Sequence, residues 1–129
     1  MDSKGQRKPL FWVGSSKDDL SEFPEDVRRV MGFAFHLAQT GARHPDAKPL
    51  KGFKGGGVVE IMDDHDGDTY RAVYTVRFKK AVYVLHAFKK KSKSGIKTPQ
   101  KDIELIYARL RRAEEDYRVF ERSNPGEQP

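Results

Sequence analysis

The segment TYRAVYTVRF, residues 69–78, alternates between apolar and mostly polar side chains. A repeat of two residues is typical of a β-strand, whose side chains point alternately to the two faces of a sheet. Residues 81–88, AVYVLHAF, follow a tight connection at Lys79 and Lys80 and are almost continuously apolar, which predicts a strand covered on both faces. The apolar face predicted for the first strand consists of Tyr70, Ala72, Tyr74, Val76 and Phe78.

Helices are predicted before and after these strands. Residues 16–23 predict a short helix, and a second helix begins at Pro24 and ends near Gly41. Near the other end of the chain, Thr98 is predicted to cap a C-terminal helix that Pro99 opens. The buried stripes expected for the two longer helices are Val27, Val30, Met31, Ala34, Leu37 and Ala38, and Ile103, Ile106, Tyr107, Leu110 and Ala113.

Two further strands and a long loop complete the predicted order of elements. Residues 9–13 and 58–62 are short apolar runs that suit strands, and the acidic residues 63–68 predict a turn. The glycine-rich residues 42–57 predict a loop. This order predicts an α+β domain in which an antiparallel meander packs against helices.

Length and composition are consistent with one domain. We predict a flexible N-terminus at residues 1–7, one domain at 8–118 and a flexible tail at 119–129 of the 129 residues. The absence of cysteine excludes disulfides and thiolate chemistry. No apolar stretch has the length of a signal peptide or a membrane span, so a soluble, cytoplasmic chain is expected.

Positive charge is concentrated in one part of the chain. Residues 69–101 contain ten Lys or Arg side chains and no Asp or Glu, and the net charge is +6. Repulsion among these cations destabilises the fold, so a surface that keeps them is expected to meet a polyanion, and nucleic acid is the first candidate. The alternative is a basic face that serves only solubility.

Four short motifs, taken in their order along the chain, resemble those of a known protein family. They are PLKG at residues 49–52, VEI at 59–61, TYRAVY at 69–74 and VLHAFKK at 84–90. Together they resemble the RelE/HigB superfamily of bacterial toxins, and its phage-related HigB-like branch in particular, over residues 8–115. The resemblance implies a RelE-like fold, with an antiparallel β-meander packed against two N-terminal helices and one C-terminal helix. It also implies a type II toxin–antitoxin system, with a small helix-turn-helix antitoxin as partner and mRNA, often at the ribosome, as the target cleaved without a metal.

The resemblance also assigns candidate catalytic residues. Arg71 matches the family arginine that contacts the scissile phosphate; the alternative is a surface arginine that bonds Glu60 across neighbouring strands, and the two are compatible. Lys89 and Lys90 match a basic pair of the family nucleases, although alternation lets only one of them share a face with Arg71. Glu60 is expected either to act as the base or to orient Arg71.

Other basic residues are candidates for binding the RNA backbone: Lys51, Lys54, Arg77, Lys91, Lys93 and Lys97. No cofactor or metal is expected, because none of the four histidines shows metal-ligand spacing with another. His86 is expected to be a hydrogen-bonded strand histidine and not a catalyst. No residue is identified as the proton donor.

Two other functions remain open at this point. A gyrase-poisoning, ParE-like toxin would share the architecture but inhibit a protein target. A non-catalytic RNA-binding module would bind RNA with strong salt dependence and cause no toxicity.

Overall fold

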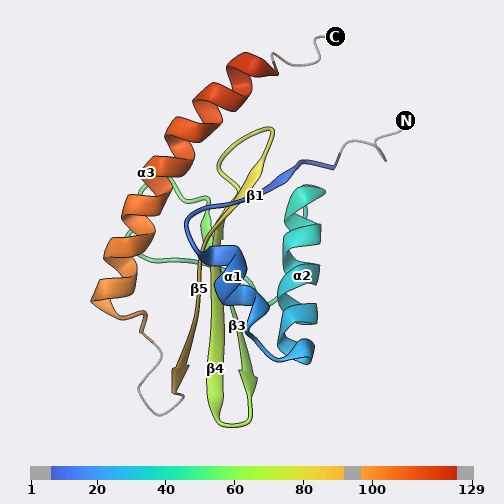
Figure 1. Ribbon diagram of the computed structural model, residues 1–129, viewed down its shortest axis with the longest axis vertical. Helices are drawn as coiled ribbons and strands as arrows, with labels where there is room; N and C mark the ends of the chain where they lie inside the picture. The colour runs from blue at the N-terminus through green and yellow to red at the C-terminus, as the bar shows by residue number, and fades with distance from the viewer. Residues whose placement is uncertain (1–6, 92–96, 125–129) are drawn as a thin grey trace.

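A computed structural model describes residues 7–91 and 97–124, without the side chain of Lys91. The chain forms one five-stranded sheet with helices on both of its faces (Figure 1). This arrangement confirms the predicted α+β class. The elements are β1 (Leu10–Trp12), α1 (Ser16–Ser21), α2 (Glu25–Gln39), β2 (Lys48–Pro49), β3 (Val58–His65), β4 (Asp68–Thr75), β5 (Val82–Lys91) and α3 (Gln100–Ser123).

The strands lie in the order β1-β5-β4-β3-β2. The meander from β2 to β5 is antiparallel, as predicted, whereas β1 pairs in parallel with β5 at one edge. Helices α1 and α2 cover one face of the sheet and α3 covers the other. Residues 81–87 are all buried, which confirms the prediction that this strand is covered on both faces.

The hairpin between β3 and β4 is tighter than the sequence predicted. Its turn consists of Asp66 and Gly67, which both have positive φ angles, at 49° and 83°. Two such residues give a turn whose twist matches that of the flanking strands. Residues 63–65 therefore belong to β3 and Asp68 to β4, and the predicted turn over 63–68 was too long.

The strand β4 also ends earlier than predicted, at Thr75. Because the chain leaves the regular strand there, the alternation does not carry as far as residue 78. Phe78 packs in the cluster beneath α3 with Tyr83, so its predicted place beside Tyr70 and Tyr74 was wrong.

The predicted end of α2 is confirmed by its capping bonds. Gly41 has a φ of 88° and donates its backbone N–H to the carbonyl of Ala38. Ala42 donates to the carbonyl of Leu37, which completes the pair of bonds that closes many helices before a left-handed glycine.

Helix α3 differs from the prediction at both ends. Pro99 occupies the N-cap position, and no side chain caps the start of the helix. The prediction that Thr98 caps this helix was therefore wrong. The helix continues to Ser123, and Phe120 packs on Phe11 with ring centroids 5.3 Å apart. The predicted tail therefore begins too early at residue 119. None of the helices in the described ranges has the length and apolar character needed to span a bilayer.

Candidate functional site

Arg71 lies at the centre of a buried polar network. It projects from β4 toward α3 and is only 1% exposed. Its Nη1 atom donates to Glu60 Oε2 and to Thr98 Oγ1, both at 3.2 Å. The Thr98 hydroxyl donates in turn to the same Glu60 oxygen, at 3.0 Å. The network joins β3, β4 and the residues that lead into α3.

This geometry confirms the predicted bond between Arg71 and Glu60 but not a surface position for the arginine. The sequence could not show that the start of α3 covers this part of the sheet. Both hydrogen bonds that Glu60 accepts fix neighbouring side chains, which fits its predicted orienting role. A phosphate could reach Nη1 only after Thr98 had moved aside.

Lys90 shares the face of Arg71, and Lys89 does not. Lys90 pairs with Thr69 in the register of β4 and β5, and its ammonium group donates to the carbonyl of Lys97. Lys89 pairs with Tyr70 on the other face, and its Nζ atom lies 3.8 Å from the Asp68 carboxylate. Alternation along the strand thus separates the two lysines as predicted.

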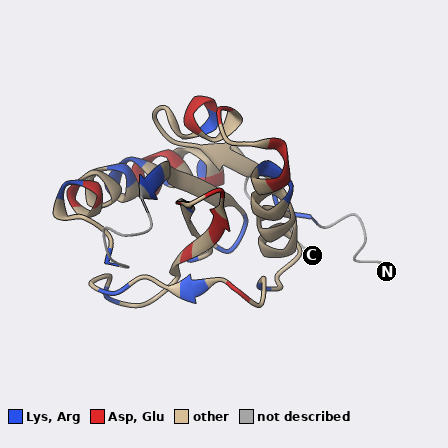
Figure 2. Ribbon diagram, turned by 90° about the horizontal axis from the view of Figure 1, so that it is seen from below, with Lys and Arg blue, Asp and Glu red and all other residues tan. Residues whose placement is uncertain are grey.

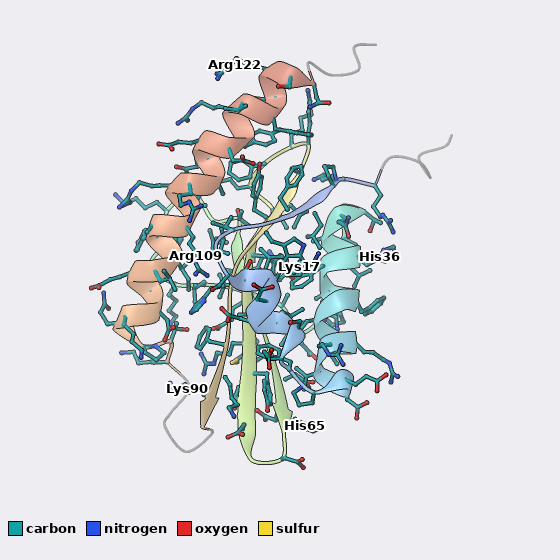
Figure 3. All side chains as sticks on the ribbon, viewed as in Figure 1. Lys17, His36, His65, Lys90, Arg109 and Arg122 are labelled. Carbon is teal, nitrogen blue, oxygen red and sulfur yellow. The ribbon has the colours of Figure 1, made fainter. Side chains whose placement is uncertain are left out.

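A groove of about 680 Å³ lies between the end of β5 and the start of α3. We call it the lysine groove; Lys90, which lines it, is labelled at the end of β5 in Figure 3. The start of α3 adds the positive end of the helix dipole to these charges. The lining residues are Phe88, Lys89, Lys90, Lys97, Thr98, Pro99, Gln100, Lys101 and Asp102.

The wall of the lysine groove contains an acid paired with an imidazole. Asp102 Oδ1 on α3 lies 2.7 Å from His86 Nε2 on β5, and the two side chains are 12% and 8% exposed. The His86 ring stacks on Phe88 with centroids 4.7 Å apart. This bond confirms His86 as a hydrogen-bonded strand histidine. Asp102 was not selected from the sequence, because an acid in the first turn of a helix is ordinary.

The other predicted RNA contacts are dispersed. Lys51 and Lys54 are exposed on the loop before β3, and Lys97 lines the lysine groove. The guanidinium of Arg77 instead holds that loop against α3, through Glu114 at 3.1 Å and the carbonyls of Lys54 and Gly56 at 2.9 and 3.2 Å. Binding of RNA by these residues stays a prediction. The side chains of Lys91 and Lys93 lie outside the described residues.

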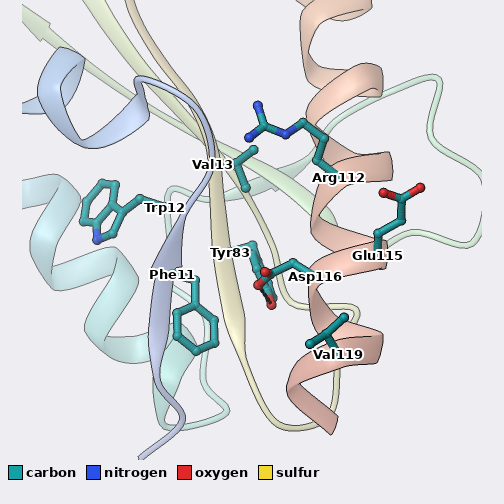
Figure 4. Close-up of a pocket in the computed structure, with 8 residues that line it drawn as sticks. All are labelled: Phe11, Trp12, Val13, Tyr83, Arg112, Glu115, Asp116 and Val119. Atoms are coloured by element: carbon teal, nitrogen blue, oxygen red, sulfur yellow. Dashed lines mark hydrogen bonds between the residues drawn. The ribbon is translucent and has the colours of Figure 1, made fainter. Parts of the chain in front are cut away.

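A second hollow, of about 450 Å³, lies between β1 and α3 (Figure 4). Its wall includes Phe11 and Val119 together with charges of both signs. Tyr83 donates a hydrogen bond of 2.7 Å to Asp116 here. The pKa of Tyr83 is raised, mainly by burial and to a smaller extent by this hydrogen bond. Basic and acidic residues alternate along α3 (Figure 2). This hollow is lined by Arg112, Glu115 and Asp116, so it lacks the excess of positive charge found at the lysine groove.

No site with three or more His, Asp or Glu side chains able to hold a metal ion occurs within residues 7–91 and 97–124.

The chain is similar to one described protein family and to a small number of solved structures. No curated protein matches the chain. One similar solved structure is the toxin–antitoxin complex RelBE2 from Mycobacterium tuberculosis, at 20% identity and a TM-score of 0.39, over 69% of this chain and 98% of that one.

Residues 18–111 match the family described as phage-derived protein Gp49-like (DUF891). The matched range makes up most of the chain and contains both the Arg71 network and the lysine groove. It confirms the phage-related branch predicted from the motifs. The chain therefore belongs to the phage-derived Gp49-like family.

Proposed function

We propose that this protein is the toxin of a type II toxin–antitoxin system and that it inhibits growth by cleaving mRNA without a metal ion. The observation that carries the proposal is the lysine groove, where four lysines and the positive end of α3 line one concavity. Such a concentration of one charge attracts the phosphates of a nucleic acid. The family match and the four sequence motifs support the same function.

Within this proposal the lysines meet the RNA. Lys97 and Lys101 are exposed, and Lys90 is half-buried between them and the sheet. Ammonium groups at this position would neutralise the phosphate as its negative charge grows during cleavage. Lys51 and Lys54, on the loop before β3, are proposed to hold the flanking backbone.

Arg71 and Glu60 are proposed to hold the wall of the groove. Their shared partner Thr98 lines the groove directly, so the network fixes the start of α3 against the sheet. Direct contact between Arg71 and the scissile phosphate, which the family resemblance implies, requires Thr98 to release the Nη1 atom. In the arrangement with Thr98 in place, the proposed contact with the scissile phosphate is therefore made by the lysines.

The proposed partner is a small helix-turn-helix antitoxin. A segment with acidic side chains would complement the lysine groove and keep RNA out of it. The toxin would then be inactive in the complex and active when free.

Mapping of RNA ends tests the proposal. Induced expression should stop growth and create new 5′ ends in cellular transcripts, and the purified protein should cleave RNA in the presence of EDTA. A groove variant, Lys90→Gln/Lys97→Gln/Lys101→Gln, should lose both effects. A charge-matched control, Lys17→Gln/Lys48→Gln/Lys79→Gln, changes three exposed lysines elsewhere and should keep them.

Two results would contradict the proposal. Growth arrest without new 5′ ends would favour a poison of a protein target such as gyrase. RNA binding without cleavage and without growth arrest would favour a non-catalytic binding module.

A further inference from the structure

Asp102 is the only acid among the nine residues that line the lysine groove. Its Oδ1 atom accepts a hydrogen bond from His86. Within the part of the chain that the structure describes, its Oδ2 atom has no hydrogen-bond partner. One carboxylate oxygen is thus fixed, and the other is available to a molecule in the groove.

His86 is placed to fix this carboxylate and not to touch a ligand. Its side chain is 8% exposed, and its Nδ1 atom is buried and lacks a hydrogen-bond partner among the described residues. A neutral imidazole with its proton on Nε2 satisfies the bond to Asp102 and leaves no donor unpaired. A doubly protonated ring would bury a second N–H without an acceptor, which is costly.

Glu60 is less suited to act on a ligand. It does not line the lysine groove, and its Oε2 atom already accepts bonds from Arg71 and Thr98. Its predicted alternative role as the base is therefore better filled by a carboxylate that lies in the groove wall.

We propose that Asp102 is the base that takes the proton from a ribose 2′-hydroxyl, and that His86 positions it through the Nε2 hydrogen bond. This inference rests on the proposed RNA cleavage. Neither residue was assigned a catalytic role by the sequence motifs, and the pair arises only because α3 packs across β5.

The reaction balances as an internal transfer at phosphorus. Asp102 Oδ2 takes the 2′-hydroxyl proton while the 2′-oxygen forms a bond to the adjacent phosphorus and the bond from phosphorus to the 5′-oxygen breaks. The ammonium group of a groove lysine gives a proton to the leaving 5′-oxygen. Solvent then removes the proton from Asp102 and restores that of the lysine. The products carry a 2′,3′-cyclic phosphate and a 5′-hydroxyl.

The test measures kcat/KM for a fluorescent single-stranded RNA between about pH 3 and 9, a range that includes the usual titration of a carboxyl group. Asp102→Asn keeps the size of the side chain and should lower kcat/KM by about 10²-fold or more. It should bind the RNA at least as tightly as the wild type, because a negative charge has left the groove. Glu104→Gln, an exposed acid on the same helix, is the matched control and should match the wild type.

The pH profile separates a role in proton transfer from a structural one. The wild-type rate should fall at low pH as the base takes up a proton, and Asp102→Asn should lose this fall. His86→Phe should keep the fall but lower kcat with little change in KM, because the carboxylate is no longer held in position by the Nε2 hydrogen bond. A substrate with 2′-deoxyribose at the cleavage site should not be cut.

Each outcome decides the inference. Asp102→Asn with wild-type rate and profile would overturn it while the proposed function stands, whereas a wild type that never cleaves RNA would remove the proposed function itself. If Asp102→Asn does not fold, Asp102→Glu replaces it. That variant should cleave more slowly with the low-pH fall preserved, and loss of the fall would overturn the inference.

Discussion

Arg71→Met is the substitution whose effect the structure specifies most closely. Methionine fills much of the same space but leaves Glu60 without its charged partner. The arginine is 1% exposed and the Glu60 side chain 12%, so water cannot fully replace the lost bond of 3.2 Å. The uncompensated carboxylate should therefore destabilise the folded state.

The magnitude follows from the burial of the pair. Removal of one partner from a buried ion pair typically costs 3–5 kcal/mol, and we expect about 3 kcal/mol here. The lower end applies because Thr98 keeps its hydrogen bond to Glu60. For a domain of this size the melting temperature should fall by about 10 °C.

Urea unfolding measures this effect, with far-ultraviolet circular dichroism and the fluorescence of the single tryptophan, Trp12, as probes. The double variant Arg71→Met/Glu60→Gln removes both charges and should recover most of the loss. An unfolding free energy for Arg71→Met within about 0.5 kcal/mol of the wild type would refute the reasoning, since surface substitutions have effects of that size.

Two further predictions concern stability. Burial raises the pKa of Tyr74 from the usual tyrosine value to about 12, so between these two values the folded state keeps a proton that the unfolded state loses. The unfolding free energy should fall as the pH rises from 10 to 12, and Tyr74→Phe should make this fall shallower in urea titrations; an unchanged fall would contradict the assignment. Gly57→Ala should destabilise by about 2 kcal/mol or more in thermal unfolding, because its φ is 82° and a Cβ would lie 2.8 Å from the Cβ of Arg77. Gly55→Ala, at a φ of 83° with nothing within 4 Å, should cost less, and equal losses would count against the contact.

The sequence predicted the central strands because their patterns are local. Alternation over residues 69–75 and the apolar run at 81–88 are both properties of a single segment. The extension of β5 to Lys91 was missed, since three consecutive lysines resemble a loop until their pairing with Asp68, Thr69 and Tyr70 is known. The same pairing determines which lysine shares the face of Arg71.

The site was harder to predict because its contacts join distant parts of the chain. The bond from Thr98 to Glu60 spans 38 residues, and that from His86 to Asp102 spans 16. Both depend on where α3 crosses the sheet, which the amphipathic stripe of the helix does not specify. The charge of Arg71 suggested a surface position, although the residue is 1% exposed and bonds Glu60 and Thr98.

The central claim is that RNA phosphates bind in the lysine groove. The most direct test is the salt dependence of binding for a labelled RNA with 2′-deoxy residues, followed by fluorescence anisotropy. Each phosphate contact on a single strand contributes about 0.7 to the slope of log K against log salt concentration. The groove variant should therefore lower the slope by about 2, while the control variant should leave it near the wild-type value. An equal change in both variants, or none in the groove variant, would contradict the claim.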